Sequence, residues 1–490
     1  MKIIVVGGGP AGVGAALRAR ELGADVTLLE STRVGGTCFN TGPAPMRALA
    51  RAARLRDDAA AFSTFGLEGA APRVNFKAAI ANGNRIAAFV NEVTHLTTRV
   101  RETGVDVVDD AGPARFVDRL TLAIADGRQF KGDRIVLTVG GHPRKLPIPG
   151  CELALSFRDL WTMEDLPKRV SVVGGSATGC QLASIMLDFG AQVDLIQAAD
   201  RLAPSGDADV SSGLESAFVA RGMNVLTAAR SEEIAAKDGR FSVAYQRGGN
   251  RLSLETDAVF LMVGWPANVG SLDVDKAGIS IRGPYIGVDE YLRTNVPEIF
   301  VAGDANGISM LVQSALLQGG IAGENAVLGP TRTYSPRAVA TGSFTNPEYG
   351  AVGLTEEQAR ASHDCVVEVV RYDRLPRAII DARIEGMCKL IVDRKSRALL
   401  GAHVLGSYSA EVIQVAATCM AAQLDVTKIA ELELAFPTFT EAIGIAARRI
   451  VRRLGLAASQ WTGQGIHDAP GAPFGQGAVA VAAPGTRPER

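Results

Sequence analysis

The chain has 490 residues, which at about 100–200 residues per domain allows two to four domains. Its composition is that of a globular protein, with 47% hydrophobic and 21% charged residues, and it contains no apolar run of about 18 residues that would predict a membrane-spanning helix. The net charge of −1 gives no sign of a nucleic-acid partner or of binding to an anionic membrane surface.

The first predicted unit is a strand, a glycine-rich turn, a helix and a second strand over residues 2–30. In the turn, GGGPAG, Gly7 permits the tight bend, Gly9 lets a pyrophosphate approach the backbone, and Gly12 permits close packing of helix on strand. The helix N-terminus then favours negative charge. Glu30 ends the second strand, where a carboxylate accepts hydrogen bonds from ribose hydroxyls. This spacing predicts a dinucleotide site.

The same pattern returns over residues 169–197 with the turn GGSATG, so a second nucleotide-binding domain is predicted. Ser176 stands where the middle glycine is usual, which requires a backbone conformation open to L-residues. Gln197 ends the strand in place of an acid. A carboxylate there would favour NAD and arginines would favour NADP, and Gln197 does neither. Arg201 is the nearest basic residue, and its alternative role is to support the loop alone. The alternative for the whole second site is that it is degenerate and no longer binds nicotinamide.

A third apolar strand over residues 298–302 ends in Gly303-Asp304. From about residue 334 the pattern changes to strands and long helices, for example over 385–406 and 409–423, which predicts a separate α+β domain. The Gly-, Ala- and Pro-rich end is expected to be a flexible tail. The six cysteines are scattered without a CxxC pair and no leader sequence is recognised, so we expect reduced thiols and a cytoplasmic protein.

Several long motifs in one order resemble the pyridine nucleotide–disulfide oxidoreductase family. They are ESTRVGGTCFNTGPAPMR at 30–47, TVG at 138–140, IFVAGDANG around Asp304, FTNPEYGAVGLTEEQA at 344–359 and FPTFTEA at 436–442. The resemblance implies an α/β fold with two Rossmann-like domains, one for FAD and one for NAD(P), and a C-terminal α+β dimerisation domain in a homodimer. The implied limits are 1–150 and 271–335 for the FAD domain, 151–270 for the NAD(P) domain, 336–457 for the dimerisation domain and 458–490 for the tail.

The family's cofactor contacts transfer to matching positions of this chain. Asp304 would bind the ribityl chain of FAD, and Gly36 and Thr37 would pass close to its pyrophosphate. The residues expected around FAD are Gly7, Gly9, Pro10, Ala11, Gly12, Glu30, Ser31, Gly36, Thr37, Ala114, Thr138, Gly140, Asp304, Met310 and Leu311. Those expected around NAD(P)H are Gly174, Ser176, Ala177, Gly179, Gln197 and Gly264. No metal site is expected.

The departures from the family concern its chemistry. The family reduces disulfides with two cysteines five residues apart, and here Cys38 is followed by Pro43, which has no thiol. The family's His-Pro acid–base motif reads Phe436-Pro437, and phenylalanine cannot move a proton. Glu441 resembles the acid that orients that histidine; without the histidine it is expected to cap a helix or line the pocket.

Two more changes lie where the family places a lysine and a glutamate near flavin N5. Here they are Arg47, which keeps the charge and could stabilise a reduced, anionic flavin, and Gln181, which can accept a hydrogen bond from it. The alternative is that Arg47 and Gln181 only pack there and that their identities have drifted without a functional reason. Cys38 lies at a helix N-terminus near Arg47, which we expect to lower its pKa. The thiol could react with an electrophile, although a leftover buried thiol is favoured.

We therefore expect an NAD(P)H oxidoreductase whose flavin reduces a quinone or another small electron acceptor. Soluble pyridine nucleotide transhydrogenases are a close alternative, because GCQLASIM and VDLIQAADRL look similar to theirs. The missing basic residues after Gln197 weaken the NADP case. A specific metabolite held in an apolar pocket of Pro43, Phe39 and Phe436 is a third possibility. The alternative from a non-enzymatic class is a catalytically degenerate FAD-binding partner protein.

Overall fold

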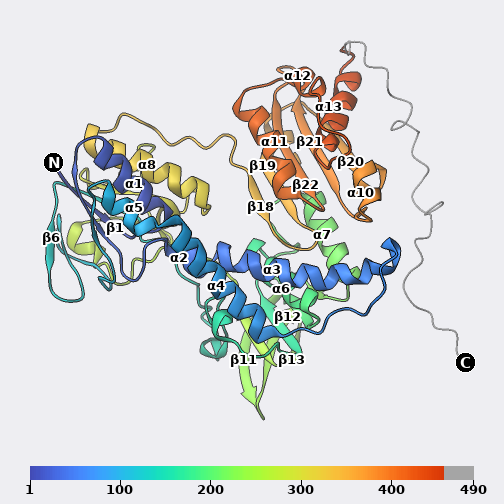
Figure 1. Cartoon of the computed structure of the whole chain (residues 1–490), viewed down its shortest axis with the longest axis horizontal. Coiled ribbons are helices and arrows are strands. Elements are labelled where there is room, and N and C mark those ends of the chain that lie inside the picture. Colours follow the sequence, from blue (N-terminus) through green and yellow to red (C-terminus); the bar gives the residue numbers. More distant parts are fainter. Residues whose placement is uncertain (457–490) are drawn as a thin grey trace, which may run out of the picture.

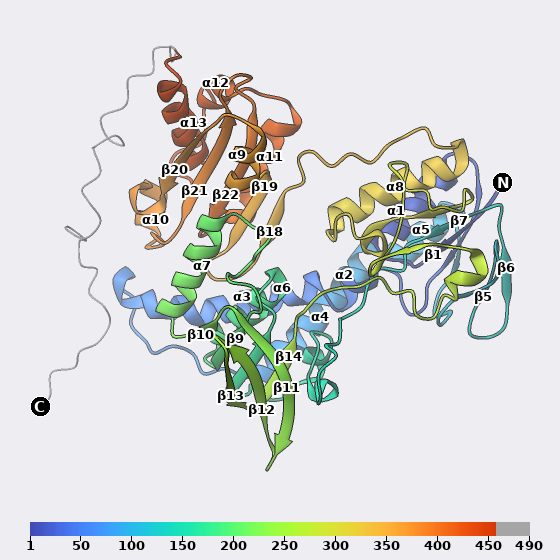
Figure 2. The same ribbon diagram turned by 180° about the vertical axis from the view of Figure 1, so that it is seen from behind.

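A computed structural model of the chain describes residues 1–456, so the tail predicted at 458–490 lies outside the described residues. Three groups of elements surround two long helices, α3 (Pro43–Asp58) and α4 (Phe76–Thr94) (Figure 1). One group holds the N-terminus, a second lies below the two helices in that view, and the C-terminal group lies above them. Figure 2 shows the same three groups from behind.

The first group is built on a parallel sheet with the strand order β17-β7-β1-β2-β3. Its apolar runs, such as KIIVV, are buried on both faces, as expected for a parallel sheet covered by helices. The strands are β1 (Lys2–Val6), β2 (Asp25–Leu29), β3 (Asp106–Val108), β7 (Arg134–Leu137) and β17 (Ile299–Val301). The associated helices are α1 (Pro10–Glu21), α5 (Leu96–Glu102) and α8 (Val312–Leu328). Helices α1 and α8 pack closely, because a Cβ on Gly319 would lie 2.0 Å from the carbonyl oxygen of Ala11.

Smaller elements complete this group. The short helix α2 (Gly36–Asn40) leads from β2 into α3. An antiparallel sheet is formed by β4 (Arg115–Asp118), β5 (Thr121–Ala123) and β6 (Gln129–Lys131), and a two-stranded one by β15 (Ile281–Arg282) and β16 (Tyr285–Ile286). Turns of 3₁₀ helix, in chain order along the whole described chain, are η1 (Ala59–Phe65), η2 (Cys151–Leu153), η3 (Asp159–Thr162), η4 (Val274–Ala277), η5 (Gly303–Asn306) and η6 (Tyr372–Arg374).

The second group repeats the first on a smaller scale. Its parallel sheet has the order β10-β9-β8-β14, and an antiparallel sheet β11-β12-β13 projects from it. The strands are β8 (Arg169–Val173), β9 (Gln192–Ile196), β10 (Asn224–Leu226), β11 (Ala229–Lys237), β12 (Arg240–Arg247), β13 (Asn250–Thr256) and β14 (Ala258–Leu261). The helices are α6 (Ala177–Phe189) and α7 (Ala208–Ala220).

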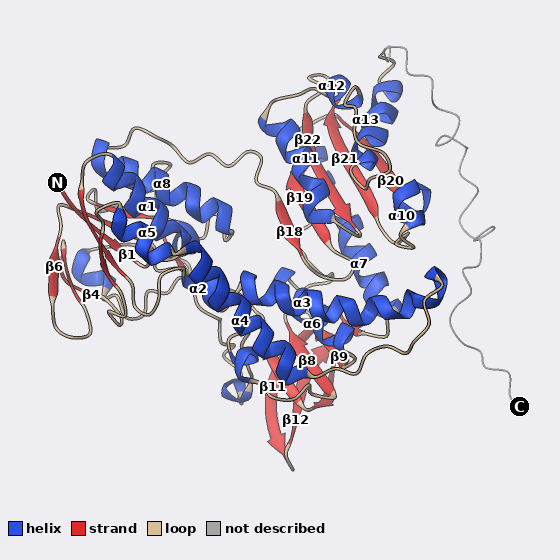
Figure 3. Cartoon of the chain, in the orientation of Figure 1, coloured by secondary structure: helices blue, strands red, loops and turns tan. Residues whose placement is uncertain are grey.

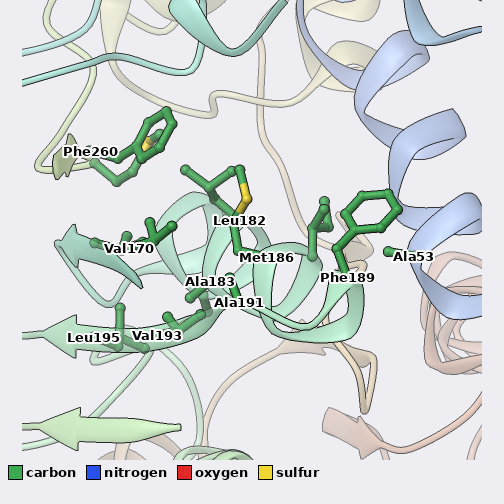
Figure 4. Packing of buried hydrophobic residues seen from close by; sticks show 14 of the residues in the cluster. Ala53, Val170, Leu182, Ala183, Met186, Phe189, Ala191, Val193, Leu195 and Phe260 are labelled. Carbon is green, nitrogen blue, oxygen red and sulfur yellow. The ribbon is translucent and has the colours of Figure 1, made fainter. Parts of the chain in front are cut away.

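Helix α3 is docked onto this second group by a shared apolar core. Phe189 at the end of α6 lies beside Ala53 of α3 in Figure 4, and its ring meets Phe76 of α4 edge-on with the centroids 5.7 Å apart. Because α3 follows directly from the first group, this core fixes the two groups relative to each other.

The C-terminal group is an antiparallel sheet with the order β18-β19-β22-β21-β20, against which helices pack (Figure 3). Its strands are β18 (Thr341–Ser343), β19 (Tyr349–Gly353), β20 (Cys365–Arg371), β21 (Met387–Asp393) and β22 (Leu399–Leu405). Its helices are α9 (Glu356–Ser362), α10 (Pro376–Ile380), α11 (Ser409–Ala421), α12 (Val426–Ala430) and α13 (Glu441–Arg453). The α+β character predicted for this region is confirmed. None of the helices between residues 1 and 456 combines the length and apolar character needed to cross a bilayer.

A buried lysine ties the C-terminal sheet to the second group. Lys389 in β21 is 2% exposed, and its Nζ lies 2.9 Å from Asp207 and 2.8 Å from Asp209 at the start of α7. Glu356 of α9 supplies a third carboxylate. His403 is a neighbour whose ring Nε2 lies 2.9 Å from the carbonyl oxygen of Leu354, and burial lowers its pKa. The cluster is a charged contact inside an otherwise apolar junction.

Candidate functional site

The carboxyl ends of both parallel sheets open into one cavity of about 2170 Å³. Ligands of open α/β sheets bind at this end of the strands. Gly7 and Glu30 line the cavity after β1 and β2, and Gly174 and Gln197 line it after β8 and β9. This volume is well above the roughly 300–1,000 Å³ of a single small-molecule pocket, so the cavity has room for more than one ligand.

The first turn has the geometry that a dinucleotide requires. Gly9 caps α1 in an extended conformation with φ −71° and ψ −176°. A Cβ on Gly12 would lie 1.7 Å from the carbonyl oxygen of Gly7, so only glycine lets the helix approach the strand. The buried carboxylate of Glu30 accepts hydrogen bonds from the backbone N–H of Gly8 at 2.6 Å and of Thr32 at 2.8 Å. The acid is therefore held at the cavity wall by the turn itself.

Asp304 is the second acidic group of the cavity. It follows β17 in η5 and accepts a hydrogen bond of 2.9 Å from the indole Nε1 of Trp265. Burial raises its pKa. A partly buried carboxyl group with one protein partner keeps further acceptor capacity for hydroxyl donors, such as those of a ribityl chain.

These residues fit the FAD that the sequence predicted. Glycines form its cradle, since a Cβ on Gly36 would lie 2.8 Å from the Cα of Gly9. Of the residues expected around FAD, all but Gly12 line the cavity, and Gly12 packs behind it: Gly7, Gly9, Pro10, Ala11, Glu30, Ser31, Gly36, Thr37, Ala114, Thr138, Gly140, Asp304, Met310 and Leu311.

The second turn has the same backbone as the first. Ser176 caps α6 with φ −82° and ψ −176°, a conformation open to L-residues, as its sequence requires. A Cβ on Gly179 would lie 1.7 Å from the carbonyl oxygen of Gly174, which reproduces the close packing at Gly12. Gly174, Ser176, Ala177, Gln197 and Gly264 line the cavity, and Gly179 lies behind it.

Gln197 takes the structural place of Glu30. Its Oε1 accepts a hydrogen bond of 3.1 Å from the backbone N–H of Gly175, and its Nε2 lies 3.4 Å from the carbonyl oxygen of Arg201. The guanidinium of Arg201 donates to the carbonyl oxygens of Pro204 at 2.8 Å and Gly206 at 3.3 Å. Arg201 therefore holds its own loop and does not line the cavity.

Sequence reasoning missed the basic residue that does reach this end of the cavity. Arg230 and Ser231 stand at the start of β11 and line the wall beside Gln197. They are brought there by the backbone, because the N–H of Ala229 donates to the carbonyl oxygen of Gln197 at 2.9 Å. More than thirty residues separate Arg230 from Gln197, and no local sequence motif predicts that the two lie together.

Arg47 and Gln181 meet at the boundary between the two halves, but through a third residue. Within residues 1–456 no hydrogen bond joins them, so the one that Gln181 could accept from Arg47 is not formed in this structure. The Arg47 guanidinium lies over the ring of Phe344, and the backbone N–H of Phe344 donates to Gln181 at 3.4 Å. Burial lowers the pKa of Arg47, while the charges of Glu348 and Glu411 oppose that shift. All three residues of the contact line the cavity.

Cys38 and Pro43 also line the cavity, from α2 and from the first turn of α3. The expectation of a lowered thiol pKa is wrong. Burial, together with the negative charge of Asp304, raises the pKa of Cys38 to about 11. Desolvation is the larger of these two causes, and the α2 helix that was expected to lower the pKa is a single turn. The thiol is therefore protonated at neutral pH and is a poor nucleophile.

Phe436 and Glu441 are not brought to the cavity within one chain. Phe436 is 69% exposed, and Glu441 begins α13 in the C-terminal group. Phe39 is also absent from the cavity wall, so the apolar pocket expected from Pro43, Phe39 and Phe436 is not assembled in the described chain. Within residues 1–456 no cluster of potential metal ligands was found.

Comparison with known families agrees with this geometry. A family model described as pyridine nucleotide-disulphide oxidoreductase matches residues 1–319, and one for the dimerisation domain of that family matches residues 339–447. The chain belongs to the pyridine nucleotide-disulphide oxidoreductase family. Members of the family are FAD-dependent and use NAD(P)H, and the dimerisation domain indicates a homodimer.

Members of the family with curated names resemble this chain over nearly its whole length. A mercuric reductase from Lysinibacillus sphaericus is 28% identical over 449 residues, which cover 91% of this chain and 82% of that protein. A dihydrolipoyl dehydrogenase from Zymomonas mobilis is 28% identical over 453 residues, covering 90% and 96%.

Solved structures agree. LpdA from Mycobacterium tuberculosis superposes with a TM-score of 0.83 at 25% identity, covering 92% of this chain and 99% of that one. The HOCl-induced flavoprotein disulfide reductase RclA from Escherichia coli gives a TM-score of 0.80 at 25% identity, covering 91% and 99%. This chain is thus a flavin-dependent oxidoreductase of the family.

Proposed function

We propose that this protein is an FAD-dependent NAD(P)H oxidoreductase that works without a redox disulfide and delivers electrons to a quinone or another small acceptor. The observation that carries the proposal is Pro43 in the cavity wall, at the position where the family's second cysteine would lie. Cys38 is the one thiol among the described cavity-lining residues, and its raised pKa disfavours a thiolate. We place the enzyme in the cytoplasm.

The chain's own residues supply binding, orientation and charge. FAD, when bound, supplies a hydride acceptor that can return electrons to a second molecule. Glu30 and Asp304 hold the two ends of its half of the cavity. Arg47 stays cationic despite burial, because a guanidinium is not deprotonated in proteins, and it places positive charge beside Gln181 at the boundary of the two halves. Phe344 fixes the plane of that guanidinium.

Counting electrons tests the proposal. The FAD-loaded protein is titrated anaerobically with NADH or NADPH, and the visible spectrum is followed. We expect full bleaching after two electrons per flavin, no long-wavelength thiolate–flavin band, and reoxidation by a naphthoquinone but not by disulfide substrates. Uptake of four electrons, or turnover with a disulfide, contradicts the proposal. No bleaching by either nucleotide assigns the protein to the degenerate FAD-binding class.

A pair of variants sharpens the test. Pro43→Cys places a thiol at the first position of α3. The backbone N–H at this position has no partner within the helix, so α3 does not depend on proline there. This variant is expected to raise the uptake to four electrons per flavin. Pro43→Ser changes the backbone in the same way without adding a thiol, and is expected to stop at two. The difference between the two variants isolates the sulfur.

Transhydrogenation between two nicotinamide nucleotides is the second candidate. A transhydrogenase must bind both NAD and NADP, and Gln197 favours this because a neutral amide does not repel the 2′-phosphate of NADP. The hydrogen bond from Gly175 to Gln197 keeps the turn intact. Exchange of reducing equivalents between NADPH and a thionicotinamide analogue of NAD, at a rate above that with quinone, would rank this activity first.

A further inference from the structure

The two halves of the cavity differ in their carboxylates, although arginines line both, with Arg47, Arg332 and Arg337 in the FAD half. The carboxylates among its described lining residues that face the nucleotide turns are Glu30 and Asp304, and both belong to the FAD half. The wall of the second half, built on β8, β9, β11 and β14, contains no carboxylate among its described residues. Its charged members are Arg158 and Arg230. A nucleotide with additional negative charge is therefore attracted to the second half without repulsion from its wall.

Of these two arginines, only Arg230 is uncommitted. Arg158 lies over the rings of Phe157 and Trp265, each with its guanidinium carbon 6.0 Å from the ring centroid. Arg230 is exposed and has no ion pair or side-chain hydrogen bond within residues 1–456. It also stands next to the end of β9, because the chain pairs Ala229 with Gln197 immediately before it.

Ser231 follows Arg230 in β11 and also lines the cavity. The side chain of Ser231 is 7% exposed, and its hydroxyl has no hydrogen-bond partner among the described residues. The hydroxyl oxygen is enclosed, and successive residues of a strand point to opposite faces, so Arg230 and not Ser231 presents its side chain to a ligand. Gln197, by contrast, is already committed to Gly175 and Arg201. The exposed side-chain donor beside Gln197 is thus that of Arg230.

We propose that the adenosine end of the second nucleotide site binds a 2′-phosphate, with Arg230 as the phosphate-binding side chain, so that NADPH is the preferred reductant. The inference rests on the proposed function, since it assigns the coenzyme of that same site. Guanidinium pairs with a phosphate dianion through two parallel N–H···O bonds. The basic residue that the sequence lacks after Gln197 is supplied here by β11.

Binding of adenosine fragments tests this inference without catalysis. Isothermal titration of the FAD-loaded protein with 2′,5′-ADP and with 5′-AMP separates the 2′-phosphate from the rest of the nucleotide. We expect 2′,5′-ADP to bind at least tenfold more tightly in the wild type. Arg230→Ala should lose about ten- to a hundredfold in affinity for 2′,5′-ADP, the range of a charge-assisted hydrogen bond, and change by less than twofold for 5′-AMP.

Arg247→Ala is the matched control, because Arg247 is exposed on the adjacent strand β12 and lies outside the cavity wall. It removes the same charge and should leave both affinities unchanged. Equal binding of the two fragments by the wild type overturns the inference. So does equal weakening of both by Arg230→Ala, which would mean that the arginine stacks on adenine.

The result also separates this inference from the function on which it rests. If the fragments bind equally and NADH bleaches the flavin, the phosphate site fails and the oxidoreductase stands. If neither fragment binds and neither nucleotide bleaches the flavin, both fail together.

Discussion

Replacing Lys389 by methionine tests whether the charged contact at the domain junction stabilises the fold. Methionine keeps the length of the side chain and removes its charge. It leaves Asp207, which is 1% exposed, without its lysine partner at 2.9 Å. Removing one partner of a buried ion pair costs about 3–5 kcal/mol. Asp207 retains backbone donors from Asp209 and Glu356, so we expect the lower end, about 3 kcal/mol.

The assay is urea unfolding of the FAD-loaded protein, followed by circular dichroism and flavin fluorescence together. Lys77→Met is the control. Lys77 pairs with Glu164 at 2.7 Å, yet both side chains are about two-thirds exposed or more, at 68% and 70%. Exposed pairs contribute only about 0.2–1 kcal/mol. The two substitutions therefore share chemistry and distance and differ in burial.

A double variant identifies the cause of the loss. The loss of stability is expected to come from the Asp207 carboxylate, which stays buried without its lysine. In that case Lys389→Met combined with Asp207→Asn should recover part of the stability lost by Lys389→Met alone. A loss for Lys389→Met no greater than that for Lys77→Met would refute the reasoning. So would a double variant that is destabilised by the full sum of the single changes.

Three further outcomes are expected. His403 has a folded pKa below its ordinary value, so the unfolded chain binds the proton first; stability should fall as pH drops from about 7 to 5, and His403→Gln should flatten that slope in pH-dependent thermal unfolding. Cys38, with a pKa of about 11, should be alkylated by iodoacetamide very slowly at pH 7 and faster toward pH 11, as peptide mapping by mass spectrometry will show; rapid labelling at pH 7 would contradict the raised pKa of this partly buried thiol. Gly12→Ala places a Cβ 1.7 Å from the carbonyl oxygen of Gly7 and should abolish FAD retention on gel filtration, whereas Gly270→Ala, which meets nothing within 4 Å, should not.

The parts of the site that could be predicted are those set by local sequence. The strand, turn and helix that place Gly7, Gly12 and Glu30 lie within thirty residues, so their spacing determines their geometry. The α+β pattern of the C-terminal region was visible for the same reason. Residues 385–406 form two strands, β21 and β22, and helix α11 covers most of 409–423.

What could not be predicted depends on distant contacts. Arg230 reaches the end of β9 only because β11 hydrogen-bonds to it. Phe344 separates Arg47 from Gln181 although it belongs to the C-terminal group. The pKa of Cys38 changes in the direction opposite to expectation, because its sign depends on burial and on Asp304, which is far away in sequence. Sequence spacing contains no information on any of these distances.

The position of β17 has a consequence for synthesis on the ribosome. This strand forms the edge of the first sheet beside β7, and the whole second sheet is made between the two. Until β17 and α8 emerge, the nascent first sheet has an open edge at β7, an uncovered face on α1 and no Asp304. The second sheet, contiguous from β8 to β14, can close earlier. The complete FAD half can therefore form only after the whole second sheet has been translated, although the phosphate turn that receives FAD is among the first residues made.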